Sequence, residues 1–226
     1  TAIIVLVRRI FFGGALGKKC IGRETSIMVS AIRVNFIVEG QTKETFVRRI
    51  LVESLAKSDV YVSGARCIET GRKKIRGPNT TKLGKQEIIF RGGMSSFEKI
   101  RRDIKLWLDE DRKAYLTTMF DLYALHEFEG LLFSDVKIMD NVLKPYHDHS
   151  KLEELNHIRG QFNTPEEIND GFKTAPSKRI IDLFKSYQKV TYGYQIAQRI
   201  GIEVIRRECP HFNEWMVKLG QLGIYG

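Results

Sequence analysis

The chain has 226 residues, 42% hydrophobic and 28% charged, a balance typical of one globular α/β domain with a buried core. Lysine and arginine total 37 against 27 aspartate and glutamate, and the resulting net charge of +10 favours polyanionic partners, nucleic acid first. No stretch approaches the roughly 18 apolar residues that a membrane span needs, so we expect no membrane partner.

The three cysteines, Cys20, Cys67 and Cys209, are widely spaced. The sequence has no CxxC pair and no Cys/His pair with zinc-ligand spacing, so we expect free thiols in a reducing, cytoplasmic environment. A GxxxxGK[ST] motif is also missing, which excludes ATP hydrolysis by a P-loop.

The chain starts on Thr1, and Met28 lies just before the first convincing strand. We therefore expect residues 1–27 to be an N-terminal extension, either upstream sequence included by a misplaced start or a mobile segment. Residues 28–226 are expected to form a single domain. The early apolar run is followed by positive charge instead of being preceded by it, which is the wrong order for a signal peptide.

Strand and helix patterns alternate in the first part of this domain. The apolar block of residues 33–38 predicts a buried strand that ends at Glu39. Apolar residues recur at helical spacing over 41–56, which predicts a helix with Thr42 as its N-cap. A second strand is predicted over residues 60–68.

A basic segment follows from Arg66 to Arg91, in which lysines and arginines are interleaved with glycines. This composition predicts a flexible loop, and the loop is the best candidate in the chain for contacts with nucleic acid. The alternative is a solvated loop without a partner. The residues expected to make the contacts are Arg72, Lys73, Lys74 and Arg76.

Beyond this loop, a helix is predicted from Ser95 or Ser96, and "YLTTMF" predicts a third strand that is stopped by Asp121. Strands that alternate with helices predict an α/β fold with a mostly parallel sheet flanked by helices. In such sheets the functional groups gather at the carboxyl ends of the strands. Glu39 and Asp121 are both predicted to lie there.

Two carboxylates at neighbouring strand ends repel each other unless a cation lies between them. Oxygen ligands without a His or Cys cluster favour Mg²⁺ or Mn²⁺ over zinc. The missing side chain of Gly40 would let phosphate oxygens approach the turn, and the N–H groups of the following helix favour an anion. Alternatively, Glu39 only caps that helix and Asp121 only ends a strand.

The stretch "HEFEGLLFSD", His126 to Asp135, predicts a helix held against the core with its polar edge facing a cleft. On an α-helix Glu127 and Glu129 point roughly 200° apart, so both can reach one ion only if the backbone there is extended. We expect one of them to be a ligand or base and the other to be structural, and the pattern does not choose between them. An amphipathic helix with ordinary exposed acids is the alternative.

The C-terminal third predicts helices over residues 150–157, 165–169, 176–187, 192–200, 202–207 and 212–219. Pro165 and Pro176 stand at first-turn positions. In "APSKR", the hydroxyl, backbone N–H groups and cationic side chains of Ser177, Lys178 and Arg179 could clamp a phosphate. The alternative is a helix that starts with proline and carries solvated charges.

Five motifs in order resemble a family of uncharacterised bacterial proteins, domain of unknown function 4276: "IVEGQTKETF", "TTMFDLY", "LHEFEGLLFSD", "TAPSKRI" and "CPHFNEWMVKL". The likeness runs from about Val29 to Leu222. That family is regarded as Toprim-like, distantly similar to the Toprim domains of topoisomerases, primases and overcoming-lysogenization-defect nucleases. The resemblance implies a Toprim-like, Rossmann-like sheet followed by a helical C-terminal part.

In Toprim domains a glutamate after the first strand and an aspartate pair after a later strand bind divalent metal and assist phosphodiester chemistry. Glu39 matches the first position and Asp121 the second. Tyr123 stands where the second aspartate of the pair is expected. In addition, "MFDLYALHEFE" joins two motifs that the family pattern separates by a further segment with another strand. Glu127 or Glu129 would then supply the missing ligand.

The resemblance implies a nuclease or phosphodiesterase that acts on DNA or RNA with Mg²⁺ or Mn²⁺ as cofactor. Nucleases of this type often work with an ATPase, so an ATPase partner and a role in bacterial defence are expected by analogy. The alternative is a non-catalytic nucleic-acid-binding or regulatory subunit with a degenerate Toprim site, which Tyr123 and the fused motifs favour.

Overall fold

The computed structural model describes residues 32–74, 87–91, 97–120, 127–146, 149–168, 171 and 173–225. The N-terminal extension predicted over residues 1–27 lies outside the described residues, so its nature stays a prediction.

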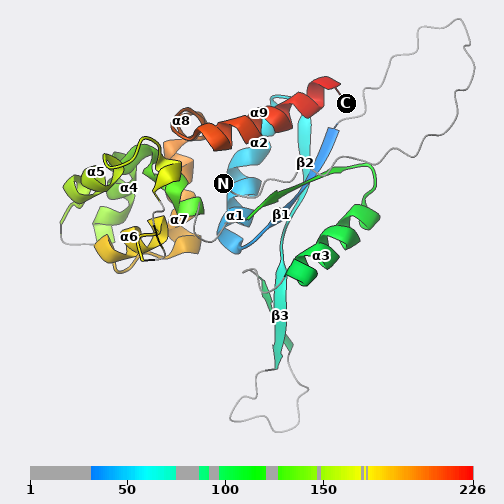
Figure 1. Ribbon diagram of the computed structural model, residues 1–226, viewed down its shortest axis with the longest axis horizontal. Helices are drawn as coiled ribbons and strands as arrows, with labels where there is room; N and C mark the ends of the chain where they lie inside the picture. Colours follow the sequence, from blue (N-terminus) through cyan, green and yellow to red (C-terminus); the bar gives the residue numbers. More distant parts are fainter. Residues whose placement is uncertain are drawn as a thin grey trace, which may run out of the picture.

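A three-stranded parallel sheet in the order β2-β1-β5 forms the centre of the fold (Figure 1). The strands are β1 (Ile32–Val38), β2 (Val60–Cys67) and β5 (Tyr115–Met119). Val34 and Phe36 of β1 join the larger apolar cluster and Ile37 joins the smaller one, so the central strand is covered on both faces. The predicted α/β fold with a parallel sheet is confirmed.

One continuous helical segment follows β1: α1 (Gln41–Phe46), a π-helical turn η1 (Val47–Leu51) and α2 (Val52–Ala56). The helix predicted over these residues is confirmed, but the predicted Thr42 cap is wrong. Gly40 is the N-cap residue, and its carbonyl accepts a hydrogen bond of 3.1 Å from the Glu44 N–H. Thr42 lies inside the first turn, where a side chain is too far along the helix to cap it.

Helices cover the two faces of the sheet. The α1–α2 segment shares its face with α9 (Pro210–Tyr225), whose Trp215 ring packs edge-on against Phe36 at 5.8 Å. Helix α3 (Phe97–Glu110) covers the other face through a smaller apolar cluster that includes Ile37 and Ile100. Both sides of the sheet are therefore removed from water around β1.

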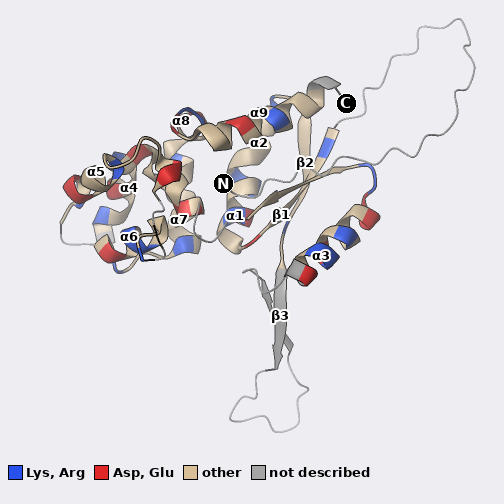
Figure 2. Cartoon of the chain, in the orientation of Figure 1, with Lys and Arg blue, Asp and Glu red and all other residues tan. Residues whose placement is uncertain are grey.

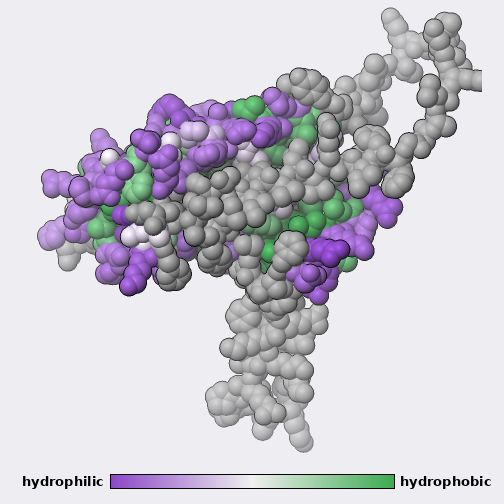
Figure 3. Space-filling view, viewed as in Figure 1, coloured by the Kyte–Doolittle hydropathy of each residue, from purple (hydrophilic) through white to green (hydrophobic). Residues whose placement is uncertain are grey.

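A helical region lies beside α1, at one end of the molecule (Figure 1). Its elements are η2 (Phe128–Asp135), α4 (Val136–Leu143), η3 (Lys144–Tyr146), α5 (Leu152–Arg159), η4 (Pro165–Glu167), α6 (Pro176–Leu183), α7 (Lys189–Ile200) and α8 (Ile202–Glu208). The predicted helical C-terminal third is confirmed, with Pro165 and Pro176 in first turns. Much of the outer surface in this region is hydrophilic (Figure 3).

The flanks of the basic segment are strands, which corrects the prediction of a loop over the whole of 66–91. β3 (Glu69–Lys74) pairs antiparallel with β4 (Glu87–Arg91), and β3 extends away from the central sheet in Figure 1. The "EIIFR" strand supplies β-branched and aromatic residues that favour a ladder, and the consecutive Arg72, Lys73 and Lys74 of β3 do not prevent one. Arg72, Lys73 and Lys74 lie on β3, and Arg76 lies outside the described residues.

Candidate carboxylate site

Glu39 follows the last residue of the central strand and is only 7% exposed. Its Oε2 lies 3.6 Å from Nζ of Lys43, one helical turn later, and Lys43 is 5% exposed. Because α1 begins at Gln41, the chain turns at Gly40 and brings the two side chains onto the same side. Lysine and glutamate are almost never this buried unless they are paired. The carboxyl end of β1 therefore carries a buried ion pair.

The neighbouring strand ends at the same edge of the sheet. Val38, the last residue of β1, is the register partner of Met119, the last residue of β5, and the strands are parallel. The predicted juxtaposition of the two strand ends is therefore confirmed. Asp121 itself, two positions after Met119, lies outside the described residues, so its part in the site stays a prediction.

The segment with the two glutamates is not an α-helix at its start. Glu127 has extended backbone (φ −106°, ψ 153°), and a 3₁₀-helix begins at Phe128, with Gly130 N–H donating to the Glu127 carbonyl at 3.0 Å. The predicted helix against the core is thus present from Phe128 onward, but it is a 3₁₀-helix that excludes Glu127. The α-helical estimate that the two glutamates point roughly 200° apart therefore does not apply. The missing side chain of Gly130 permits the close approach of η2 to η4, because a Cβ there would lie 3.1 Å from the Pro165 carbonyl oxygen.

Glu127 contacts the start of α6. Its Oε2 accepts a hydrogen bond of 3.1 Å from the backbone N–H of Ser177, in the first turn of that helix. The carboxylate thus occupies the helix N-terminus, where unpaired N–H groups and the helix dipole favour negative charge. The stretches around Glu127 and Ser177, which were predicted to belong to one site, therefore do meet. The anion at the start of α6 is the Glu127 carboxylate.

The residues of the predicted phosphate clamp have different environments. The Ser177 side chain is buried, and Lys178 is exposed. Arg179 donates from Nε to the Thr174 carbonyl at 2.7 Å, and its guanidinium lies 5.5 Å from the centre of the Phe162 ring. Arg179 therefore holds the chain before α6, and Lys178 is the member of the trio that faces solvent.

Glu129 is another deeply buried carboxylate, with 3% of its surface exposed. Its Oε1 lies 3.4 Å from Nζ of Lys189, whose side chain is 45% exposed at the start of α7. Helix α7 packs against both α1 and η2. The ring centres of Phe46 in α1 and Phe128 in η2 lie 5.2 Å apart. The Glu129–Lys189 and Glu39–Lys43 pairs thus lie on elements that are packed together.

Tyr187, just before α7, completes this region. Its hydroxyl is buried and has no hydrogen-bond partner among the described residues. Burial and the charges of Glu129 and Glu127 raise the pKa of the phenol, so it stays protonated. Sequence reasoning missed Lys43, Lys189 and Tyr187. Lys43 has a signal, its i,i+4 spacing from Glu39, whereas the other two are far from the glutamates in sequence.

The side chains present match the donor chemistry of Mg²⁺ or Mn²⁺ in kind. Glu39 and Glu129 supply carboxylate oxygens, which these ions prefer. Across the described parts of the chain, no group of three or more His, Cys, Asp or Glu residues is arranged to hold a metal ion. A further ligand would have to come from a residue such as Asp121, beyond the described residues.

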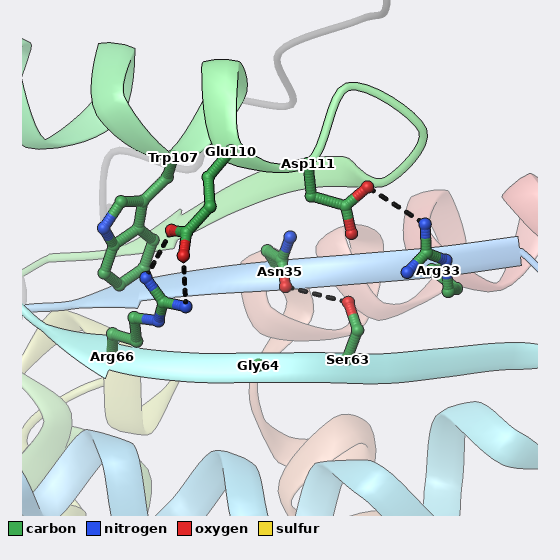
Figure 4. A pocket seen from close by; sticks show the side chains of 8 residues that line it. All are labelled: Arg33, Asn35, Ser63, Gly64, Arg66, Trp107, Glu110 and Asp111. Carbon is green, nitrogen blue, oxygen red and sulfur yellow. Dashed lines mark hydrogen bonds and ion pairs between the residues drawn. The ribbon is translucent and has the colours of Figure 1, made fainter.

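A pocket of about 360 Å³ lies between β1, β2 and the end of α3, away from the carboxylate site (Figure 4). Arg33 forms an ion pair with Asp111 at 2.9 Å. Arg66 donates two hydrogen bonds to the Glu110 carboxylate in a bidentate contact, and its guanidinium lies over the Trp107 ring. The hydrogen bond and charge of Arg66 hold the pKa of the Glu110 carboxyl below its usual range. The positive and negative charges of these residues neutralise one another. The contacts therefore hold the end of α3 against the sheet.

The fold and the site define an α/β protein with buried carboxylates, each paired with a lysine, at and beside the carboxyl edge of a parallel sheet. The chain belongs to the family described as a domain of unknown function, DUF4276, whose model matches residues 38–125 and 124–220. The two matched pieces meet where "MFDLY" runs into "LHEFE", the junction at which the family pattern was expected to contain a further segment.

No curated protein and no solved structure matches the chain. The match of the family model confirms the predicted membership of domain of unknown function 4276, and the Toprim-like relationship stays a prediction. In the described parts of the chain, no helix combines the length and the apolar character that crossing a membrane requires.

Proposed function

We propose that the protein is a Toprim-like phosphodiesterase that cleaves nucleic acid with the help of Mg²⁺ or Mn²⁺. The observation that carries this proposal is the buried Glu39 carboxylate directly after the central strand, held by the buried Lys43. Burying an ion pair costs desolvation energy that an apolar pair of similar size would not, so stability alone does not account for it. A cation or substrate at this strand end does account for it.

Glu39, Asp121 and Glu129 are the residues that would hold the metal. We favour Glu129 over Glu127 because the Glu127 carboxylate already accepts the Ser177 N–H. A bound Mg²⁺ would polarise the phosphodiester and lower the pKa of an attacking water. Lys43 and Lys189 neutralise the two carboxylates in the absence of metal. Once displaced from them, their ammonium groups would be free to contact phosphate oxygens.

The charge distribution supports nucleic acid as the substrate. The net charge is +10, and β3 carries Arg72, Lys73 and Lys74. Helix α3 also carries basic residues along its length (Figure 2), with Arg101, Arg102 and Lys105 among them. Basic groups along a phosphate backbone release counterions on binding, which gives affinity without sequence preference. An ATPase partner and a role in bacterial defence follow from analogy with Toprim nucleases alone.

The test is cleavage of plasmid DNA and of RNA with Mg²⁺ or Mn²⁺, for the wild type and Glu39→Gln. We expect cleavage by the wild type and none by the variant. Glu53→Gln removes an exposed glutamate further along the same helical segment and serves as the matched control. Because Glu39→Gln removes a carboxylate that pairs with the buried Lys43, the double variant Glu39→Gln, Lys43→Met provides a protein that lacks the Glu39 carboxylate without that imbalance of charge. Cleavage that survives in both variants would refute the proposal.

A second candidate function is a non-catalytic nucleic-acid-binding or regulatory subunit. Glu127 acts as a cap for α6, and Tyr123 replaces an expected aspartate. Glu39 and Glu129 each pair with a lysine, and no metal-holding cluster of three or more acids, histidines or cysteines is found among the described residues. Under this alternative, the wild type and Glu39→Gln bind DNA or RNA equally well and neither cleaves it.

A further inference from the structure

The Tyr187 hydroxyl has an unusual environment for a buried polar group. The residue is 7% exposed, its oxygen is inaccessible to water, and none of the described residues offers it a hydrogen bond. Native proteins leave few such groups unpaired, and those that remain call for an explanation. The ring is held firmly, because Tyr187 N–H donates to the Phe184 carbonyl and the ring stacks on Tyr192.

The space around the hydroxyl exists because residue 193 is a glycine. A Cβ on Gly193 would lie 3.3 Å from the Tyr187 oxygen, 3.1 Å from Thr42 Cγ2 and 3.4 Å from Phe128 Cε1. The hydroxyl is therefore lodged where α1, η2 and α7 converge. This is the same junction that joins the Glu39 and Glu129 pairs.

The charged groups that act on the hydroxyl are Glu129 and Glu127, and with burial they keep it protonated and able to donate. Glu127 already accepts the Ser177 N–H. Glu129 is held at 3.4 Å by Lys189, whose side chain is nearly half exposed and can swing into solvent. Of these two carboxylates, Glu129 is therefore the candidate acceptor for the Tyr187 hydroxyl.

We infer that Tyr187 is a positioning residue of the carboxylate site, whose hydroxyl donates to Glu129 once that carboxylate has exchanged Lys189 for a divalent cation. This inference rests on the proposed function. No covalent bond changes in this step. The Lys189 ammonium leaves Glu129, the cation replaces it as the positive partner, and the Tyr187 hydroxyl donates a hydrogen bond that orients the carboxylate. Outer contacts of this kind fix the direction of a metal ligand and strengthen binding.

The test measures Mn²⁺ affinity by calorimetry and thermal unfolding without metal, for the wild type, Tyr187→Phe and Glu129→Gln. Tyr194→Phe, in the same helix as Gly193 and half-buried, is the matched control. We expect Tyr187→Phe to unfold at the same temperature as the wild type or higher, because it removes an unpaired buried hydroxyl. It should also bind Mn²⁺ about tenfold or more weakly. The control should change neither quantity.

The inference is overturned if Tyr187→Phe binds Mn²⁺ as tightly as the wild type while Glu129→Gln does not. It is also overturned if Tyr187→Phe unfolds at a clearly lower temperature without metal, since the hydroxyl is then already bonded in the resting protein. A wild type that binds no Mn²⁺ at all refutes the proposed metal chemistry itself, together with this inference, and is thereby distinguished from the first two results.

Discussion

The Glu127 carboxylate accepts a hydrogen bond of 3.1 Å from the Ser177 backbone N–H, across 50 positions of sequence. Helix α6 has Ala175 at its N-cap and no cap from its own side chains, so Glu127 supplies from another segment what a local Ser or Asp usually supplies. The contact ties the entry to η2 to the start of α6.

Glu127→Ala is expected to lower the free energy of unfolding by about 1–2 kcal/mol, because it leaves the first turn of α6 without an acceptor. Glu127→Gln keeps an acceptor oxygen and loses only the charge, so its loss should be smaller. Urea unfolding of both variants measures the difference. Equal stability of Glu127→Ala and the wild type would show that the cap contributes nothing.

Lys43→Met is expected to cost roughly 3–5 kcal/mol of unfolding free energy, because it removes the buried ammonium group that pairs with the buried Glu39 carboxylate. The double variant Glu39→Gln, Lys43→Met should recover most of this loss. Mn²⁺ should raise the melting temperature of Lys43→Met more than that of the wild type, since the cation no longer competes with the lysine. Additive effects of the two substitutions would contradict a coupled pair.

Stability should fall as the pH rises above about 9. Burial raises the pKa of the Cys209 thiol from 9.0 to about 12, and the pKa of the Tyr187 hydroxyl is also raised from its usual value of 10.0. The folded state therefore keeps protons that the unfolded state releases, so each group lowers stability by up to about 1.4 kcal/mol per pH unit between its two pKa values.

Unfolding measured from pH 8 to 11 tests this expectation. Cys209→Ala should reduce the decline that begins near pH 9, and Tyr187→Phe should reduce the part above pH 10. Lysine titration near the top of this range is common to all three proteins and cancels in the comparison. An identical decline in all of them would contradict the predicted role of these groups.

Replacing Arg72, Lys73 and Lys74 together by alanine should weaken binding to duplex DNA and reduce its salt dependence. If each side chain contacts one phosphate, the slope of log K against log salt becomes shallower by about 2 to 3. The matched control removes three exposed lysines elsewhere, Lys57, Lys137 and Lys144. A slope that changes equally in both proteins would mean that net charge, and not the β3 strand, sets the affinity.

Local patterns in the sequence were enough to predict the helices and strands and the edge of the sheet at which the candidate site lies. Apolar blocks over 33–38 and 60–68 and helical spacing over 41–56 matched β1, β2 and the α1–α2 segment. These features depend on the period of side chains along one segment, which the sequence displays directly. The position of Glu39 at a strand end followed from the same reasoning.

The sequence-based predictions failed where the backbone conformation of a residue depended on a segment far away in the sequence. Composition suggested a loop around Arg72, yet pairing with β4 makes a strand, because the ladder hydrogen bonds come from the other segment. The extended backbone at Glu127 was not predicted either. It depends on how η2 packs closely against η4, and the helical spacing of apolar residues in this segment does not reveal that packing.

The sequence by itself determined that this is a basic α/β protein with a carboxylate at the end of its first strand, because charge, hydrophobic period and strand ends are properties of the chain. Only the tertiary structure decided that Lys189 neutralises Glu129, that Glu127 caps α6 and that Tyr187 lies against Gly193. Each of those contacts joins segments far apart in sequence, and their meeting is fixed by how α1, η2, α6 and α7 pack.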